Sequence, residues 1–144
     1  MIKKFIKKFT PKRILSAYHF SLAFLGAFFY GFPSRKIKAI GVTGTNGKTT
    51  VTEMISKILE EAGFKVALLN SIHFKIGGRE RVNDLRMTMP GRFKLQKFLR
   101  EAVNSKCQYV ILEITSEGIK QYRHKFIDFA AAILTNLSPE HIEA

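Results

Sequence analysis

The chain has 144 residues, of which 46% are apolar, and a formal net charge of +13 at pH 7. This length accommodates one domain with a buried core, and the apolar fraction is too high for a disordered chain. The first thirteen residues hold six lysines and arginines and no acid, which leaves 18 basic and 11 acidic residues in the remainder. The remainder is moderately basic and has no recognised nucleic-acid-binding motif, so we expect a domain that handles polyanionic nucleotides and does not bind nucleic acid.

Two helical patterns precede the first predicted strand. Residues 1–10 alternate apolar and basic side chains at helical spacing, which is typical of a short basic helix on an anionic membrane surface, although a solvated terminus is the alternative. Residues 14–32 have no formally charged side chain and are just long enough for a membrane span. Three features argue against a membrane span. The first half contains polar residues, the second half contains Gly26 and Gly31, and a span would place the N-terminal basic residues outside the cell. We expect residues 1–36 to be a helical segment that packs on its own protein or lies at the membrane interface.

Residues 37–63 have the order strand, glycine-rich loop and helix, which is typical of a phosphate-binding unit. The loop sequence GTNGKTT lies between a β-rich run at 37–42 and helical periodicity at 49–62. Its glycines let backbone N–H groups turn toward phosphate oxygens, and the helix N-terminus adds a partial positive charge. We expect Lys48 to reach the terminal phosphates and the Thr49 hydroxyl to bind magnesium. The predicted nucleotide-binding residues of the loop are Gly44, Thr45, Asn46, Gly47, Lys48, Thr49 and Thr50.

Strands and helices continue to alternate downstream. The predicted elements are a strand at 65–69, a hairpin within 71–82 that turns at 77–78, a helix at 93–103 and strands at 109–114 and 131–135. This order predicts an α/β fold in which helices flank a mostly parallel sheet that contains the phosphate loop. Ligands bind such sheets at the carboxyl ends of the strands. The polar segments that follow the predicted strands are 43–49, 70–71, 113–117 and 136–141.

Each of the two longer predicted helices has an apolar set of residues at helical spacing. The sets are Val51, Met54, Ile55, Ile58 and Leu59 in the first, and Phe93, Leu95, Phe98, Leu99 and Val103 in the second. We interpret Phe93, Phe98 and Leu99 as core packing and not as a ligand-binding surface. His19, His73 and His124 have no motif context, and we interpret them as structural or solvated.

The strand-end segments resemble the central domain of the Mur ligases, ATP-dependent enzymes that build the peptide of bacterial peptidoglycan. TGTNGKTT is similar to the phosphate loop of that family, in which the usual first glycine of the motif is missing, as it is here at Val42. ILEITSEG and TNLSPEHIEA resemble two further segments of the family, and the resemblance covers residues 37–144. It implies that Glu113 and His141 are metal ligands and that Asn136 lies near the adenine nucleotide. An acid directly after a buried strand, such as Glu113, would also face the phosphates in the predicted topology.

A subtype is indicated by TMPGRFKLQ, which resembles a segment of the Mur ligases that add the third peptide residue. The resemblance implies that Thr88, Met89 and Pro90 contact the UDP-sugar peptide. The segment after Glu113 extends the implied substrate contacts to Thr115, Ser116 and Arg123. Glu117 departs from the pattern, because the subtype has a histidine at that position.

The resemblance implies a reaction in two steps. A carboxylate of a UDP-N-acetylmuramoyl peptide attacks the γ-phosphate of ATP, which gives an acyl phosphate and ADP, and the amino group of an amino acid then displaces phosphate. Catalysis would depend on positioning and charge neutralisation by Lys48 and by Mg²⁺ bound to Thr49, Glu113 and His141. The expected catalytic residues are therefore Lys48, Glu113 and His141.

The chain ends where the Mur ligases continue, so the sequence predicts a fragment that binds nucleotide weakly and does not complete ligation. We expect a cytoplasmic monomer with peripheral contact to the inner face of the membrane through residues 1–36. The single Cys107 excludes an intramolecular disulfide and is expected to be a reduced structural thiol. Two alternatives remain: another amide ligase of the same superfamily, such as a folylpolyglutamate synthetase or a cell-wall amidation partner, and an inactive nucleotide-binding fragment.

Overall fold

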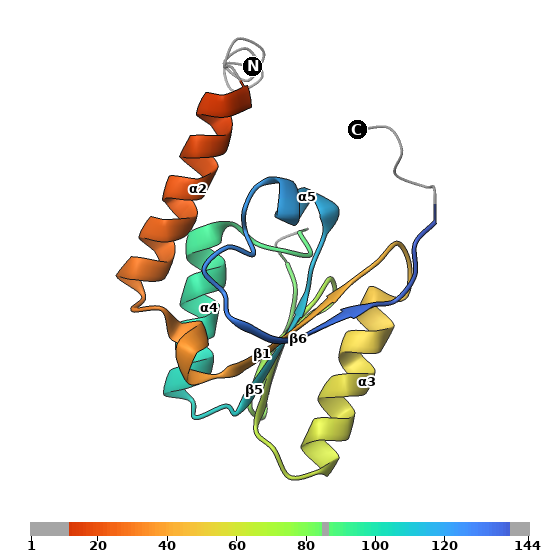
Figure 1. Ribbon diagram of the computed structural model, residues 1–144. Coiled ribbons are helices and arrows are strands. Elements are labelled where there is room, and N and C mark those ends of the chain that lie inside the picture. The colour runs from red at the N-terminus through yellow and green to blue at the C-terminus, as the bar shows by residue number, and fades with distance from the viewer. Residues whose placement is uncertain (1–11, 85–86, 139–144) are drawn as a thin grey trace.

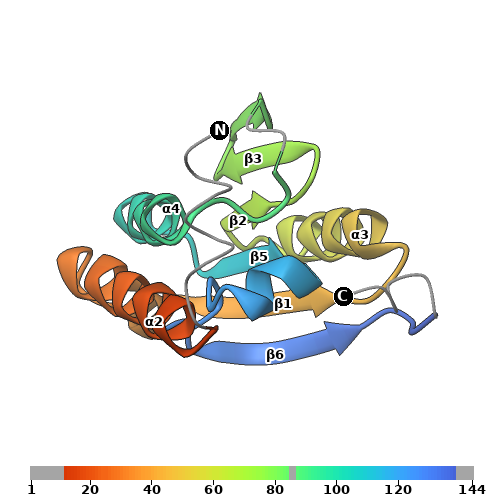
Figure 2. The same ribbon diagram turned by 90° about the horizontal axis from the view of Figure 1, so that it is seen from above.

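A six-stranded sheet lies at the centre of the computed structural model, which describes residues 12–84 and 87–138. Helix α3 covers one face of the sheet, whereas α4 covers the other face and α2 lies outside α4 (Figures 1 and 2). The elements are α2 (Lys12–Phe29), η1 (Pro33–Lys36), β1 (Lys38–Thr43), α3 (Lys48–Glu61), β2 (Val66–Leu69), β3 (His73–Ile76), β4 (Arg79–Val82), α4 (Arg92–Asn104), β5 (Tyr109–Glu113), α5 (Ser116–Lys120) and β6 (Phe129–Leu134). The prediction of an α/β fold with helices on both faces of the sheet is confirmed.

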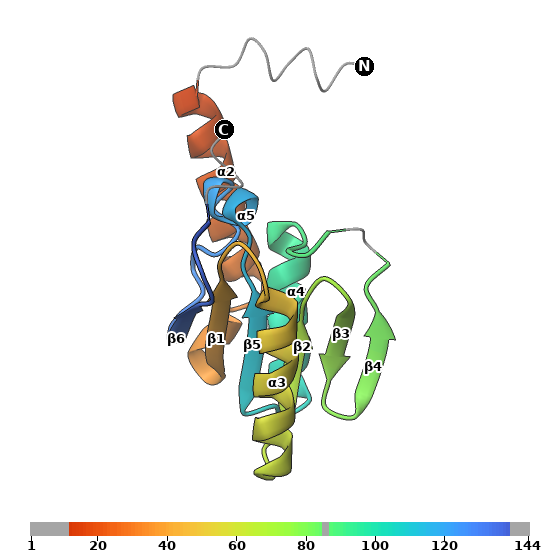
Figure 3. The same ribbon diagram turned by 90° about the vertical axis from the view of Figure 1, so that its right-hand side faces the viewer.

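The strands are ordered β4-β3-β2-β5-β1-β6, as Figure 3 shows from the side of α3. Strands β2, β5, β1 and β6 are parallel, whereas β3 and β4 form an antiparallel hairpin at one edge, with its turn at Gly77-Gly78 as predicted. Every residue of β2 is buried, because helices cover both faces of the parallel part of the sheet. The carboxyl ends of the four parallel strands therefore meet at one edge, where the register pairs Val42 with Glu113 and Leu69 with Leu112.

The core consists of one apolar layer on each face of the sheet. The layer toward α4 includes Leu69, Leu95, Phe98, Leu99 and Leu112, and the layer toward α3 includes Val42, Leu68, Val51, Ile55 and Leu59. The interpretation of Phe93 as core packing is wrong, because Phe93 is 41% exposed. In the apolar set of α3, Met54 and Ile58 are 57% and 64% exposed. The line of α3 that contacts the sheet is rotated toward Thr52 and Ser56, which are fully buried, and this rotation turns Met54 and Ile58 outward.

Helix α2 packs on α4, in line with the first of the two expectations for this segment, a helix that packs on its own protein. Small residues form the contact: Ala23 and Ala27 are 1% and 0% exposed, and Gly26 is buried between them. A Cβ atom at Gly26 would lie 3.6 Å from the backbone of Arg92. None of the described helices is long and apolar enough to cross a membrane.

We predict that Gly26→Leu destabilises the protein and that Gly26→Ala does not. A Cβ fits at ordinary contact distance and alanine favours a helix over glycine by about 1 kcal/mol, whereas the larger leucine side chain would push α2 from α4 and cost about 1–3 kcal/mol. Urea denaturation followed by circular dichroism gives both values. Equal stability of the two variants would contradict a close contact of α2 with α4.

Candidate functional site

The phosphate loop joins β1 to α3 at the edge where the parallel strands end (Figure 1). Gly44 and Gly47 have φ values of 137° and 79°, which residues with a side chain rarely adopt. A Cβ atom at Gly44 would also lie 2.1 Å from the Thr135 hydroxyl oxygen, so this position excludes a side chain on two grounds. Gly47 is the N-cap of α3, and the loop therefore leads directly into a helix N-terminus, the end that favours anions.

The end of β6 holds the loop in place. Asn46 N–H donates to the Asn136 side-chain oxygen at 2.9 Å, and the Asn136 amide donates back to the Asn46 carbonyl at 3.2 Å. The Thr135 hydroxyl donates to the same carbonyl at 2.7 Å. The structure thus places Asn136 against the loop backbone, and its expected proximity to adenine stays a prediction. The sequence analysis did not predict this role for Thr135. Its position as a polar residue directly after a parallel strand is the signal that could have indicated it.

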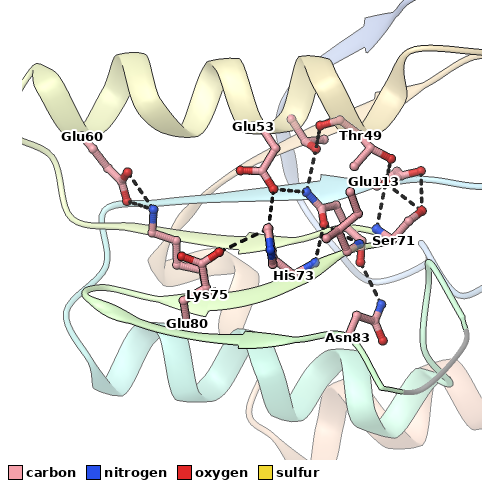
Figure 4. Close-up of polar contacts among 12 residues, drawn as sticks. Thr49, Glu53, Glu60, Ser71, His73, Lys75, Glu80, Asn83 and Glu113 are labelled. Carbon is pink, nitrogen blue, oxygen red and sulfur yellow. Dashed lines mark hydrogen bonds and ion pairs between the residues drawn. The ribbon is translucent and has the colours of Figure 1, made fainter.

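Lys48 and Thr49 begin α3 and point in different directions. The Lys48 ammonium donates to the carbonyl oxygens of Gly44 and Thr45, both at 2.8 Å, and is thereby held over the loop. The Thr49 hydroxyl instead points to β5 and donates to a carboxylate oxygen of Glu113 at 2.9 Å (Figure 4). Thr50 is exposed.

Glu113 is 2% exposed and its carboxylate is held by neutral donors. Besides Thr49, the Ser71 backbone N–H donates to it at 3.0 Å and the Ser71 hydroxyl at 3.1 Å (Figure 4). Hydrogen bonds of this kind satisfy a buried carboxylate but leave its negative charge in place.

The oxygen atoms of Thr49 and Glu113 fit a magnesium ion. Mg²⁺ takes hard oxygen ligands and is usually held by one or two carboxylates together with phosphate oxygens and water, not by a cage of protein ligands alone. Residues 12–84 and 87–138 contain no cluster of three or more histidine, cysteine or acidic residues that could hold a metal. The third predicted ligand, His141, lies outside the described residues.

Ser71 links the carboxylate to the segment predicted to contact substrate. Its hydroxyl lies 2.8 Å from that of Thr88. The fully buried Asn70 fixes this position, because its side-chain oxygen accepts from the N–H groups of Ile72 and His73 at 2.9 and 2.7 Å. The sequence signal for this pair was two polar residues directly after a buried strand, but no role was predicted for Ser71.

The donor group of Asn70 connects the strand end to α3. It donates to Glu53 at 2.7 Å, and Glu53 also lies 2.9 Å from Nδ1 of His73 (Figure 4). Burial would raise the pKa of Glu53, but the hydrogen bonds from His73 and Asn70 outweigh it, so the pKa is lowered. The stability that these contacts contribute is present above the ordinary pKa of about 4.5 and is lost as the pH falls through the lowered value. His73 is therefore structural, as interpreted from the sequence.

The other predicted substrate residues lie around the start of α4 and α5. Met89 is 2% exposed and Pro90 is buried, so neither presents an accessible side chain. The Arg123 guanidinium donates to the Met89 carbonyl and to the Gln121 side chain. A Cβ atom at Gly118 would lie 2.3 Å from the Met89 sulfur, so Gly118 is needed for this packing.

Two residues of the segment after β5 have different surroundings. The Thr115 hydroxyl accepts from the Gly118 N–H at 3.0 Å and caps α5, whereas Ser116 is exposed. Glu117, at the position where the subtype has a histidine, is also exposed and bonds to Gln121. The structure thus brings residues 88–90 and 115–123 together, with Thr88 half-buried and Ser116 exposed.

A separate cleft of about 510 Å³ lies between the β3–β4 hairpin and α4. Its charged residues are of both signs: Arg79, Glu80, Arg81, Lys97 and Glu101. Neither the phosphate loop nor Glu113 borders it. We assign the site from the loop, because phosphate loops bind through backbone N–H groups at an open surface and need no deep cavity.

Comparison with known proteins agrees with this geometry. The family model described as the Mur ligase middle domain matches residues 42–144. A UDP-N-acetylmuramoyl-L-alanyl-D-glutamate--2,6-diaminopimelate ligase from Syntrophomonas wolfei is 37% identical over 85% of this chain and 25% of its own length. The enzyme of the same name from Clostridium tetani is 42% identical with the same coverage, and a UDP-N-acetylmuramyl-tripeptide synthetase from Roseiflexus is 38% identical.

Two solved structures share the fold. One is a UDP-N-acetylmuramoyl-L-alanyl-D-glutamate--2,6-diaminopimelate ligase, with a TM-score of 0.62 and 28% identity over 74% of this chain and 21% of that one. The other is Escherichia coli FolC in complex with DHPP and ADP, with a TM-score of 0.59 and 21% identity over 92% of this chain and 40% of that one. The chain spans about a quarter of the length of the curated relatives it matches. With a family match over residues 42–144 and a phosphate loop of the family's form, the chain belongs to the Mur ligase family.

Proposed function

We propose that this chain is the ATP-binding part of a ligase that adds an amino acid to a UDP-N-acetylmuramoyl peptide. The proposal rests above all on the contact between Thr49 and Glu113 behind the phosphate loop, 2.9 Å long. It gives two oxygen ligands for Mg²⁺ at the helix N-terminus that would bind the phosphates. The relatives named above supply the substrate class, because their names describe a muramoyl peptide ligase. The folylpolyglutamate synthetase alternative has only a likeness of fold, at 21% identity.

The residues of the loop would bind and align ATP. Backbone N–H groups at the start of α3 would receive the phosphates, and Lys48 would neutralise charge on the terminal ones. Thr49 and Glu113 would hold Mg²⁺, with His141 as the third ligand in the proposal. When bound, the ion supplies positive charge to the phosphate oxygens.

The proposed chemistry needs no protein nucleophile. A carboxylate oxygen of the muramoyl peptide bonds to the γ-phosphorus of ATP while the bond to the bridging oxygen breaks, which gives an acyl phosphate and ADP. The amine of the amino acid then bonds to the acyl carbon, phosphate leaves and the nitrogen loses a proton. Thr88 and Ser116 would contact the peptide, whereas Arg123 would act as a positioning residue because its guanidinium is bonded to Met89 and Gln121.

Ser71 would couple the two halves of this site. Its hydroxyl reaches both the Glu113 carboxylate and the Thr88 hydroxyl, at 3.1 and 2.8 Å. A shift of Glu113 on binding Mg²⁺ would therefore alter the hydrogen bonding of the substrate segment. We include Ser71 among the site residues as one that positions Glu113.

We place this activity in the cytoplasm, where ATP is available, and expect a monomer.

Burial raises the pKa of the Cys107 thiol, so the group stays protonated and unreactive. Contact of residues 1–36 with the inner face of the membrane is a separate proposal that does not depend on the ligase chemistry. The basic helix predicted at residues 1–10 lies outside the described residues.

We predict that Lys48→Ala weakens binding of Mg²⁺–ATP by about 10-fold to 100-fold, because a hydrogen bond to a charged group contributes about 1.5–3 kcal/mol. Isothermal titration calorimetry measures the dissociation constant. Lys57→Ala is the matched control, because it removes the same charge from an exposed position of the same helix. Equal affinities of the two variants would exclude a role for Lys48 in phosphate binding.

We predict that Glu113→Gln removes most of the magnesium dependence of ATP binding while the fold is kept. Glutamine retains an oxygen that accepts from Thr49 and Ser71, but it lacks the charge that Mg²⁺ requires. ATP affinity is measured with Mg²⁺ and with EDTA, and Glu117→Gln is the control for loss of one exposed acid nearby. If the ratio of the affinities with Mg²⁺ and with EDTA is the same in Glu113→Gln as in the unaltered chain, Glu113 is not a metal ligand.

A further inference from the structure

The outer face of α2 is a continuous apolar stripe. It consists of Ile14, Tyr18, Ser21, Leu25, Phe28 and Phe29, which we call the outer stripe. Steps of three or four residues from Ile14 to Phe28, with Phe29 next to Phe28, place them on one side of the helix, along about 22 Å at 1.5 Å per residue. The exposed fractions of Leu25, Phe28 and Phe29 are 49%, 66% and 74%. The polar groups of the stripe are the hydroxyls of Ser21 and Tyr18.

The rest of the helix holds this stripe in a fixed orientation. Ala23, Gly26 and Ala27 contact α4 on the opposite side. On one flank, the rings of Phe20 and Phe24 lie 5.2 and 5.5 Å from that of Phe126, between centroids. The outer stripe therefore cannot turn inward without breaking both contacts.

The ring contacts within the outer stripe stay local. Tyr18 contacts His19, Phe28 contacts Phe24, and Phe29 contacts Tyr30. Beyond its other flank the apolar surface continues across a hollow of about 380 Å³ lined by Leu22, Met87, Pro90 and Phe93, beside the basic residues Arg92 and Lys94. An exposed apolar surface of this extent marks an interaction site.

The charged residues nearest to the outer stripe in the sequence are all basic. The first 52 residues contain ten lysines and arginines and no acid, since the first acidic residue is Glu53. Arg13 is exposed at the start of the stripe, and Arg35 and Lys36 are exposed just after its end. The acid that approaches this group is Asp128, which lies 3.8 Å from Arg35 with both side chains mostly exposed, so the pair contributes little.

We propose that the outer stripe docks this protein on an anionic lipid bilayer. The apolar side chains would enter the boundary between headgroups and acyl chains, and the flanking basic residues would lie at the level of the lipid phosphates. The absence of acidic residues through position 52 favours an anionic lipid surface over a neutral one. The docking goes beyond the proposed ligase function and does not rest on it.

The position of α2 makes this docking compatible with nucleotide binding. Figure 2 shows α2 on the outside of one face of the sheet and α3 on the opposite face. A bilayer along the outer stripe would therefore leave α3 and the phosphate loop in water. Binding to vesicles and binding of ATP should be independent of each other.

The test is co-sedimentation of the full chain with vesicles of phosphatidylcholine alone or mixed with phosphatidylglycerol. We expect at least about tenfold stronger binding to the mixed vesicles, because each basic residue near the surface adds about 1 kcal/mol of attraction. Phe28→Ser/Phe29→Ser should lower that binding by about tenfold or more, because two aromatic rings that would enter the bilayer are lost. Met54→Ser/Ile58→Ser is the matched control, because it removes two exposed apolar residues from α3, on the opposite face.

Three outcomes would overturn the proposal. Vesicle binding by Phe28→Ser/Phe29→Ser equal to that of the unaltered chain would assign membrane contact to residues 1–10 instead of the outer stripe. Equal or absent binding to both kinds of vesicle would exclude recognition of anionic lipid. A smaller particle size for the stripe variant in size-exclusion chromatography, without a change in vesicle binding, would make the stripe a contact between copies of the chain. ATP affinity measured on the same samples separates these failures from a failure of the ligase proposal.

Discussion

The buried carboxylate of Glu113 is the point on which the site depends. A charge in this position is costly unless it is fully hydrogen-bonded, and its donors come from two different elements: Thr49 from α3 and Ser71 from the end of β2. These bonds fix the start of α3, and with it the phosphate loop, relative to the sheet. They leave a negative charge close to the positive end of a helix, a combination that suits a divalent cation bound together with phosphate.

Much of the fold was predictable because its signals are local. The loop GTNGKTT, the buried strands and the Gly77-Gly78 turn each follow from a few adjacent residues. Helical spacing, in contrast, does not determine which side of an apolar set meets the sheet. The sheet contacts α3 along Thr52 and Ser56, and this choice left Met54 exposed.

The contacts within the site depend on pairing between distant strands and were predictable only in part. Glu113 and Thr49 could be placed together because both follow strands or loops at one edge of a parallel sheet. The bond between Ser71 and Glu113 requires the register of β2 on β5, and the bond between Asn136 and Asn46 requires β6 to lie beside β1. Neither register can be read from spacing in one sequence, so neither the role of Ser71 nor the contact of Asn136 with the loop backbone was predicted.

A series of contacts connects helix α2, on the outside of one face of the sheet, to the segment proposed to contact substrate. Gly26 of α2 lies against the backbone of Arg92, whose guanidinium donates to the Gln121 carbonyl at 3.0 Å. Gln121 in turn binds Arg123, which holds Met89 next to Thr88. Helix α2 therefore supports the segment proposed to contact the muramoyl peptide, whereas the proposed nucleotide site is supported by α3 on the other face. A surface that docks α2 would therefore lie on the side of the sheet that carries α4 and the proposed substrate segment, and not on the side of α3.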